Sequence, residues 1–390
     1  MPVHAPLARL DAAIAPHRQR LATPALVIDL DAVDHNIAAL VGRCGDPKRW
    51  RPHIKTVKQA EILRRLFEHG VHACKCATLG ELELVLETAT DADVAVDVLV
   101  AYPLHQAAFR AATELALAHP KAQVSFLADS PGHAREMQSW ASGERRWPLY
   151  FDVDVGMHRT GTFAARWQVH AAALSEQLTG FELAGLHGYD GHLSAEQAED
   201  ACAAYDELCA LALGFAAAGV AVPEIITSGS HTYHLALAHA GLAGGAWRHT
   251  ISPGTIVLSD LRCTAAIADL DLHQAAFVAA RIISRDGVRR ITVDAGSKAL
   301  SPDRPAPNCE VLGWPELTAQ TPSEEHLPLD VGGLATPPLG HLLWLVPDHV
   351  CTTVNLYRVA LLIRGEEIVG ESPIGGGRRL WLRPPPATAD

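Results

Sequence analysis

The sequence predicts an α/β protein in which a (β/α)8 barrel of the TIM type is followed by a C-terminal antiparallel β domain. Between Thr23 and about Asp260, apolar runs alternate with helical patterns, which is typical of a parallel sheet built from βα units. The units number roughly eight, which fits a closed barrel of about 250 residues. After about Leu261 the segments become short, β-rich and separated by Gly and Pro, which indicates antiparallel strands. We therefore expect a barrel over 24–260 and a β domain formed by 1–23 and 261–390.

The elements follow in order along the chain. The first apolar run, ALVIDL, leads into a helix near Asp31, and the run that contains Lys55 leads into a helical segment ending at Gly70. The later barrel runs are VHACKCA, VDVLVAYP, VSFLADS, LYFDVDV, FELAGLHGY and EIITSGS. The β domain is expected to contain AAFVAARIISR, RRITVDAG, LLWLVPDHVCTTVNLY and VALLIRGEEIVG.

Composition narrows the class of protein. The chain has 390 residues, of which 48% are hydrophobic and 19% charged, so we expect a folded soluble protein with a large core. The net charge of -12 argues against nucleic acid as a partner. No apolar run is long enough to span a membrane, and the N-terminal segment lacks a signal-peptide core, so we expect a cytoplasmic protein. The eight cysteines form no C-x-x-C pair, and most are expected to be reduced and buried.

The segment RWRPHIKT ends one predicted barrel strand, and chemistry in such barrels gathers at strand ends. Residues i and i+2 of a strand share a face, so His53 and Lys55 are expected to point the same way. A lysine inside a barrel loses solvation, which lowers its pKa and makes its amine a nucleophile able to form a Schiff base. A lone lysine would more often lie exposed in a loop, but the flanking Arg51, Pro52 and His53 favour the functional interpretation.

Two later strand ends also carry polar side chains. DVDVGMHRTG contains Arg159, which could meet an acidic or ring-nitrogen partner, although a surface arginine fits the spacing too. GLHGYDGHL places His187, Tyr189 and His192 after another strand, where an aromatic ring can stack on a planar cofactor. Each of these histidines, taken singly, is more often a structural residue.

The last two barrel loops, ITSGSHTY and ISPGTIVL, both combine Gly with Ser or Thr. Late loops of such barrels often bind a phosphate through backbone N–H groups and hydroxyls. Each motif is weak alone, but together they predict a phosphate site.

The β domain contributes VPDHVCTTVNLY, in which His349 and Cys351 lie two residues apart, so a strand would present both on one face. Imidazole and thiolate together favour zinc. A buried cysteine beside a structural histidine fits the spacing equally well. Two protein ligands would leave positions open for a substrate oxygen.

Taken together, the motifs TPALVIDLDAVDHNI, RPHIKT, DVDVGMHRTG, GYDGH, SPGT, SEEHL and DHVCTTVNLY resemble the D-threonine aldolase and D-serine dehydratase family, alanine-racemase-like enzymes that use pyridoxal 5'-phosphate (PLP). The motifs occur in the expected order across nearly the whole chain. The resemblance implies one lysine that binds PLP covalently, further cofactor contacts and a pair of metal ligands. These are respectively Lys55; Arg159, Tyr189, Ser230, Gly254 and Thr255; and His349 with Cys351.

The resemblance implies a PLP-dependent lyase with a divalent metal, zinc or manganese, that cleaves a β-hydroxy-D-amino acid to glycine and an aldehyde. His53 and His192 are candidates for proton transfer. Aldolases of the family tend to carry His-x-Asp as the metal pair, whereas His-x-Cys is the dehydratase pattern, so a D-serine or D-3-hydroxyaspartate dehydratase is the alternative. A PLP racemase is a further alternative; it would share the barrel and the lysine but would not need the His-x-Cys pair. The resemblance also implies a homodimer.

Overall fold

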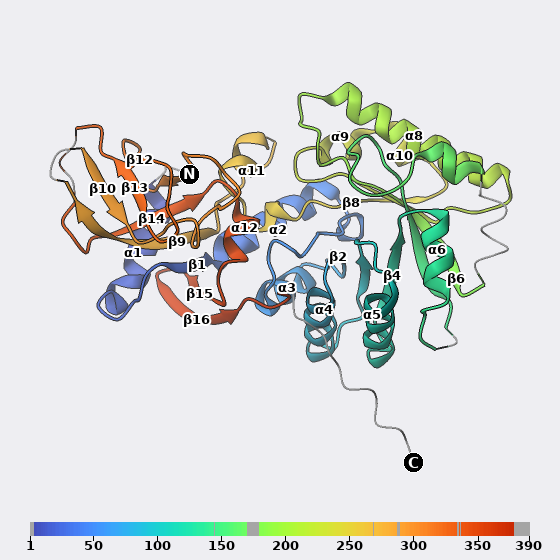
Figure 1. Cartoon of the computed structure of the whole chain (residues 1–390), viewed down its shortest axis with the longest axis horizontal. Helices are drawn as coiled ribbons and strands as arrows, with labels where there is room; N and C mark the ends of the chain where they lie inside the picture. Colours follow the sequence, from blue (N-terminus) through green and yellow to red (C-terminus); the bar gives the residue numbers. More distant parts are fainter. Residues whose placement is uncertain are drawn as a thin grey trace, which may run out of the picture.

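The computed structural model describes residues 4–143, 145–169, 179–267, 269–286, 289–333, 335 and 337–377. It contains two large sheets, one of seven parallel strands and one of nine strands. Figure 1 shows the nine-stranded sheet and the parallel sheet as two separate bodies, with helix α2 (Leu30–Cys44) running between them. Among the described residues, no helix combines the length and the apolar character that a membrane span requires.

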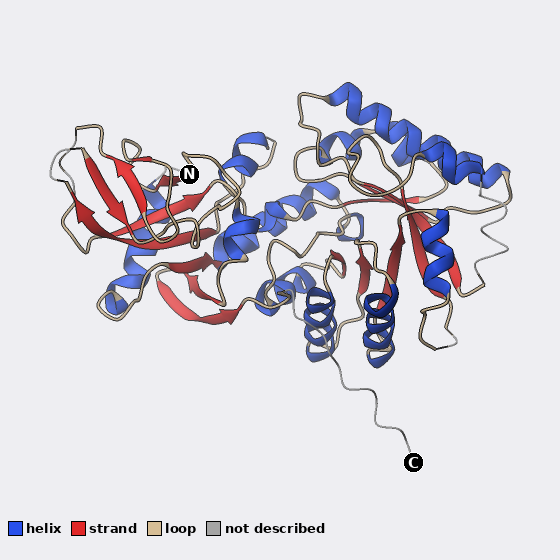
Figure 2. Cartoon of the chain, viewed as in Figure 1, coloured by secondary structure: helices blue, strands red, loops and turns tan. Residues whose placement is uncertain are grey.

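The parallel sheet runs in sequence order from β2 to β8, and helices pack along it (Figure 2). Its strands are β2 (Ala73–Cys76), β3 (Asp97–Val100), β4 (Gln123–Ala128), β5 (Trp147–Asp152), β6 (Phe181–Gly188), β7 (Glu224–Thr227) and β8 (Arg248–Ile251). The helices of this part are α3 (Ala60–Glu68), α4 (Leu79–Asp91), α5 (Gln106–Ala118), α6 (Pro131–Gln138), α8 (Ala198–Ala217), α9 (Tyr233–Ala238) and α10 (Ala240–Gly244). The predicted TIM-type architecture is confirmed.

An irregular segment, 50–53, links the two edge strands of this sheet. Trp50 forms a parallel bridge with Ile251 of β8, and His53 forms one with Lys75 of β2. The backbone N–H of Lys75 donates to the Pro52 carbonyl over 2.8 Å. The segment that carries the predicted PLP lysine therefore occupies the first position of the barrel.

The first apolar run was expected to open the barrel, and this is wrong. It forms β1 (Ala25–Asp29), which pairs antiparallel with β9 (Ala276–Arg285) and parallel with β15 (Val359–Arg364) in the other sheet. Both faces of β1 are buried: Leu26 and Ile28 pack in the main core, whereas Val27 packs in the core beneath α1. A strand that is buried on both faces has the same continuous apolar pattern in either sheet. The apolar pattern of β1 therefore could not show to which sheet it belongs. The structure thus places the start of the barrel after α2, later than residue 24.

The nine-stranded sheet confirms the predicted antiparallel β domain, with β1 and β15 as a parallel pair within it. Because β10 also pairs with β9, six of its strands close on themselves around a separate hydrophobic core. The remaining strands are β10 (Arg290–Val293), β11 (Cys309–Val311), β12 (Thr318–Ala319), β13 (Leu327–Asp330), β14 (Leu342–Pro347) and β16 (Glu367–Pro373). Short helices α11 (Leu261–Ala266) and α12 (Val350–Val354) accompany this domain, and the N-terminal α1 (His4–Ile14) packs on its sheet.

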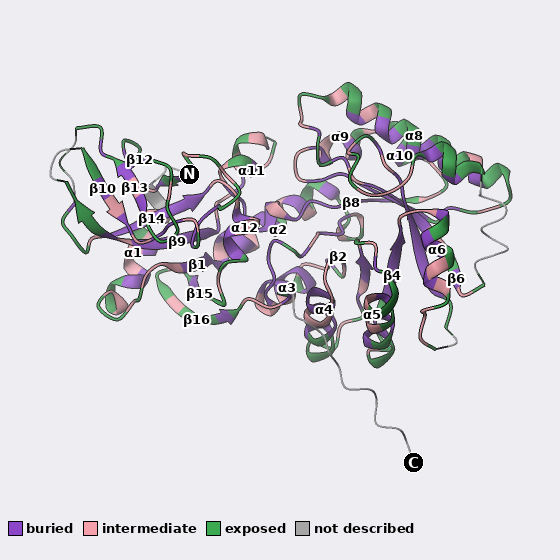
Figure 3. Ribbon diagram, in the orientation of Figure 1, coloured by how far each residue is buried: buried purple, intermediate pink, exposed green. Residues whose placement is uncertain are grey.

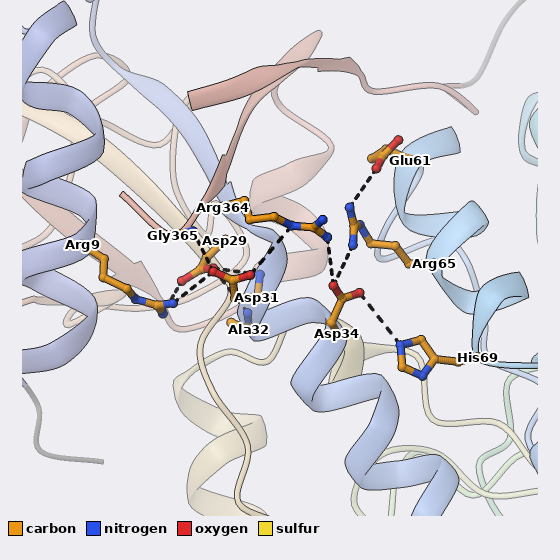
Figure 4. A network of polar contacts seen from close by, with 10 residues as sticks. All are labelled: Arg9, Asp29, Asp31, Ala32, Asp34, Glu61, Arg65, His69, Arg364 and Gly365. Carbon is orange, nitrogen blue, oxygen red and sulfur yellow. Dashed lines mark hydrogen bonds and ion pairs between the residues drawn. The ribbon is translucent and has the colours of Figure 1, made fainter. Parts of the chain in front are cut away.

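Ion pairs hold the start of α2 against both domains (Figure 4). Arg9 of α1 binds Asp29 over 2.6 Å on the β-domain side. Asp34 of α2 receives Arg65 of α3 over 2.7 Å and Arg364 of β15 over 3.1 Å. Such multi-partner contacts fix the orientation of the connecting helix, which in turn positions the β domain relative to the barrel.

The SEEHL motif forms a structural turn. The backbone N–H groups of Ser297 and Lys298 donate to the carbonyls of Ser323 and Glu324 over 2.9 and 3.0 Å. A Cβ on Gly296 would lie 2.4 Å from both carbonyl oxygens, so this approach requires glycine.

Candidate active site at the barrel mouth

Figure 3 shows the strands of the parallel sheet as largely buried. Side chains near the starts of these strands, such as Asp97 at the start of β3 and Glu224 at the start of β7, form a lower polar layer. Arg51 is fully buried and donates to Asp97 over 2.7 and 2.9 Å and to Glu224 over 3.3 Å. The Tyr150 hydroxyl donates to Glu224 over 2.5 Å, and Arg248 binds the same carboxylate over 2.6 Å. Although burial opposes ionisation of Glu224, these cations hold its pKa below the usual value. The carboxylates of this layer are paired, as buried charges must be.

Three strands of the same barrel, β2, β5 and β6, contribute an upper polar layer. Lys75 of β2 is only 2% exposed, and its Nζ lies 3.2 Å from Nε2 of His187 on β6. Nδ1 of His187 lies 2.7 Å from Oδ1 of Asp152 on β5. The other oxygen of Asp152, Oδ2, is buried without a hydrogen-bond partner. The three side chains form a chain of hydrogen bonds that is not fully satisfied.

Burial and the nearby Lys55 lower the pKa of Lys75 to about 7. The pKa of His187 is also lowered, by burial and then by the charge of Lys75. An ionised Asp152 can only accept, so Nδ1 of His187 donates to it and the lone pair of Nε2 faces Lys75.

Lys55 lies in the turn that follows the bridge at His53, and its side chain is exposed. Its backbone N–H donates to Nδ1 of His53 over 3.3 Å. Burial and the charge of Lys55 hold the pKa of His53 well below its usual value. A desolvated lysine was expected at position 55, but the chain leaves the strand before it. The desolvated lysine is Lys75, which the sequence argument did not select.

Two cations lie over the ring of the predicted aromatic residue, Tyr189. The Arg159 guanidinium is 4.9 Å and the Lys75 amine 5.7 Å from the centroid of its ring. Arg159 itself is exposed, and burial raises the pKa of the Tyr189 phenol. His192 is exposed beside Gly156, where a Cβ would meet its Nε2 at 3.2 Å.

The two late loops present hydroxyls with no partner. The Oγ atoms of Ser228 and Ser252 are buried and make no hydrogen bond with any residue that the structure describes, and Ser228 adopts φ +59°. The predicted Ser230 is partly buried next to them, and a Cβ on Gly254 would lie 2.5 Å from the His53 carbonyl. Unpaired buried hydroxyls are costly unless a ligand satisfies them, so both loops suit a phosphate. Ser228 and Ser252 belong to the two loop motifs, but nothing in the sequence singled them out.

His349 and Cys351 were expected to share one face of a strand, and this is wrong. Strand β14 ends at Pro347, so His349 caps α12 and Cys351 lies within that helix. The Cys351 Sγ lies 3.1 Å from Oγ1 of Thr56 and 3.6 Å from Oγ1 of Thr255. The β domain therefore places Cys351 against the residue that follows Lys55 and against the second predicted phosphate loop.

The two side chains contact each other despite the helix. A hydrogen bond with Cys351 raises the pKa of His349 to about 9. Burial opposes ionisation of Cys351, but that hydrogen bond and the charge of His349 lower the pKa of the thiol below its usual value. Nδ1 of His349 lies 2.7 Å from Asp303, which the sequence argument missed because 46 residues separate the two. A thiolate, an imidazole and a carboxylate that orients the imidazole form a donor set suited to zinc.

A second group with metal-ligating side chains, His35, Asp271 and His273, contains none of the predicted site residues. The two imidazoles stack 3.9 Å apart at an angle of 3°. Nε2 of His35 also lies 2.6 Å from the Asp271 carbonyl oxygen. Parallel rings direct their lone pairs alongside each other rather than toward one ion.

The fold agrees with comparisons to known proteins. The chain belongs to the family defined by the alanine racemase N-terminal domain, whose model matches residues 28–257. The model of a serine dehydratase domain matches residues 275–363, within the β domain.

Particular relatives match over most of the chain. The D-threonine aldolase of Arthrobacter sp is 26% identical over 375 residues, 92% of this chain and 90% of that protein. The D-threo-3-hydroxyaspartate dehydratase of Delftia sp. is 27% identical over 364 residues, 85% of this chain and 92% of that protein. The crystal structure of D-threonine aldolase from Filomicrobium marinum has a TM-score of 0.77 at 24% identity, covering 90% of this chain and 94% of that chain. The predicted family is confirmed, as is the prediction of an enzyme, a lyase of the kind these relatives represent.

Proposed function

We propose that this protein is a PLP- and metal-dependent lyase that cleaves a β-hydroxy-D-amino acid to glycine and an aldehyde. The observation that carries the proposal is the contact of Cys351 with Thr56, because it brings the metal pair of the β domain next to Lys55 of the barrel. Such a junction suits a reaction that needs both an amine-bound cofactor and a Lewis acid.

The residues present fit PLP. Lys55 would hold the cofactor covalently, and the unpaired hydroxyls of Ser228 and Ser252 would donate hydrogen bonds to its phosphate oxygens. Gly254 and Thr255 would add backbone and hydroxyl groups from the second loop. When bound, PLP supplies an electron sink for the bond that breaks at the substrate α-carbon.

The residues also fit a soft divalent metal, zinc being favoured by the thiolate. His349 and Cys351 would bind it, and Asp303 would keep Nδ1 of His349 protonated and so leave Nε2 as the ligand atom. A Lewis acid there favours loss of the proton from the substrate β-hydroxyl.

The other predicted residues orient and protonate. The Arg159 guanidinium lies over Tyr189, and together they would form one wall of the site. His53, kept neutral by burial and the neighbouring lysines, is suited to accept a proton. His192 remains a candidate for the same role at the exposed side.

The choice of aldolase over dehydratase rests on the GYDGH and TTVNLY motifs, which resemble the aldolase branch of the family more than the dehydratase branch. It rests also on the similarity to the Arthrobacter sp aldolase. Against it stand the His-x-Cys pair and the similarity to the Delftia sp. dehydratase. A homodimer, a cytoplasmic location and zinc rather than manganese remain predictions.

The first experiment replaces Lys55 by Ala. We expect the absorbance band of lysine-bound PLP and all turnover to disappear, because no other residue would hold the cofactor. A variant that keeps this band would contradict the assignment. Lys58→Ala offers a matched control, since Lys58 lies three residues away in an ion pair with Glu81.

The second experiment tests the metal pair and the reaction together. His349→Ala and Cys351→Ala should lose the metal and turnover but keep the PLP band. Each protein is given D-threonine or D-serine, with and without chelator, and glycine and ammonia are assayed separately. Formation of glycine from D-threonine supports the aldolase, and formation of ammonia from D-serine supports the dehydratase. Turnover that survives the chelator and persists in both variants rejects the metal site.

A further inference from the structure

Lys75, His187 and Asp152 are not explained by holding the cofactor or the metal. They lie on three different strands, β2, β6 and β5, yet form one chain of hydrogen bonds, 3.2 Å from Lys75 to His187 and 2.7 Å from His187 to Asp152. In the lower layer, which is purely structural, the buried cation Arg51 is paired directly with carboxylates. Within the described part of the chain, Lys75 has no direct carboxylate partner, and Oδ2 of Asp152 is unpaired.

The position of Lys75 connects this chain to the candidate site. Lys75 bridges to His53, two residues before Lys55, and its Nζ faces the Tyr189 ring at 5.7 Å. Strand neighbours of Lys75, Cys74 and Cys76, pack in the outer core, so Lys75 points to the barrel interior.

We propose that Lys75 is a catalytic proton donor of this lyase, with His187 and Asp152 as its positioning residues. The proposal rests on the proposed function. In the cleavage of a β-hydroxy amino acid, the β-hydroxyl proton passes to a base, for which His53 is the candidate, and that base later releases it to solvent. The electron pair of the broken Cα–Cβ bond takes up a different proton at Cα. The ammonium form of Lys75 supplies the proton that Cα takes up. It thereby becomes a neutral amine, and it regains a proton from solvent before the next turnover.

The electrostatic surroundings suit this role. The charged groups that act on Lys75 are Lys55, Arg51 and Arg159, which disfavour its protonated form, and Asp152, which favours it. Neutral His187 accepts from it, and His53 lies across the bridge. An amine with a pKa near the working pH can both give and regain a proton, whereas an ordinary lysine would keep it.

The test compares the wild type with Lys75→Met, Lys75→Arg and Asp152→Asn, each loaded with PLP. The first readout is the absorbance of lysine-bound PLP from pH 5.5 to 9. We expect a transition with a midpoint near 7 in the wild type, none in the Met and Arg variants, and a lower midpoint in Asp152→Asn, since removing that carboxylate disfavours protonated Lys75. A transition unchanged in Lys75→Met, or an absent one in the wild type, overturns the proposal.

The second readout is the exchange of the glycine α-proton in D2O, followed by NMR. This half-reaction moves the proton at Cα without breaking a carbon–carbon bond. Lys75→Met should slow it by about 10²–10⁴-fold, the usual contribution of a positioned acid or base. Exchange at the wild-type rate overturns the proposal.

The two levels of the proposal fail differently. A wild-type chain that shows no band of lysine-bound PLP rejects the proposed function, and the role of Lys75 with it. A chain that binds PLP and turns over, but whose pH transition and exchange rate do not depend on Lys75, rejects only the role of Lys75. If Lys75→Met does not fold, the midpoint in Asp152→Asn decides, because an unshifted midpoint contradicts the coupling.

Discussion

The two polar layers inside the barrel each contain a buried cation, but the two cations have different partners. In the lower layer Arg51 binds Asp97 and Glu224, so the buried cation is compensated directly. In the upper layer the cation is Lys75, which contacts the imidazole of His187 and the ring of Tyr189 but no carboxylate among the residues that the structure describes. Buried charges that are paired act structurally, and those left without a direct counterion have perturbed pKa values that are typical of functional sites. Burial alone therefore does not distinguish a structural residue from a reactive one; the hydrogen-bond and ion-pair partners of the buried side chain do.

The largest expected effect comes from breaking the lower layer. Arg51→Met leaves two carboxylates without their main counterion, and the loss of one partner of a buried pair typically costs about 3–5 kcal/mol of stability. Urea unfolding should show this loss. Arg248→Met is the control, because Arg248 is 48% exposed and the Arg51 pair persists, so a much smaller loss is expected. Equal losses in the two variants would contradict the structural role of Arg51.

The next effect has the opposite sign. Folding lowers the pKa of Lys75 from 10.5 to about 7, so the unfolded chain binds the proton more tightly and folding is penalised. The penalty is complete below pH 7, where it amounts to up to about 5 kcal/mol, and it falls as the pH rises from 7 to 10.5. Lys75→Met should therefore raise the melting temperature at pH 6.5, and this gain should shrink at pH 9. A gain that does not change with pH would show that Lys75 is charged throughout.

The smallest effect compares two unpaired serines. Ser228→Ala should weaken PLP binding by about 10–100-fold, the value of one hydrogen bond to a charged group. Ser125 on β4 is also buried with an unpaired Oγ, but it lies outside both predicted phosphate loops, so Ser125→Ala should leave PLP affinity unchanged. A titration of the apo protein with PLP, followed by absorbance, measures both. Equal affinities in the two variants would remove Ser228 from the phosphate site.

Sequence patterns could predict the fold because they report local periodicity. Alternating apolar runs and helices predicted the barrel, and Gly- and Pro-separated β segments predicted the second domain. The order of motifs around Lys55, Tyr189 and Cys351 was sufficient to predict the family. Local patterns could not assign β1 to its sheet, because its two buried faces fit either one.

Residues that are close along the chain were sufficient to predict the two architectures and the family, which are confirmed. They also led to the proposed lysine and metal pair, which remain predictions. The tertiary structure alone brings His349 and Cys351 together at a helix end rather than on a strand, and it places Cys351 against Thr56. It also decided that the desolvated amine is Lys75, because burial and hydrogen-bond partners come from strands more than 70 residues away in sequence, with His187 separated from Lys75 by 112 residues. Desolvation is a property of the surrounding fold, and a sequence pattern does not contain it.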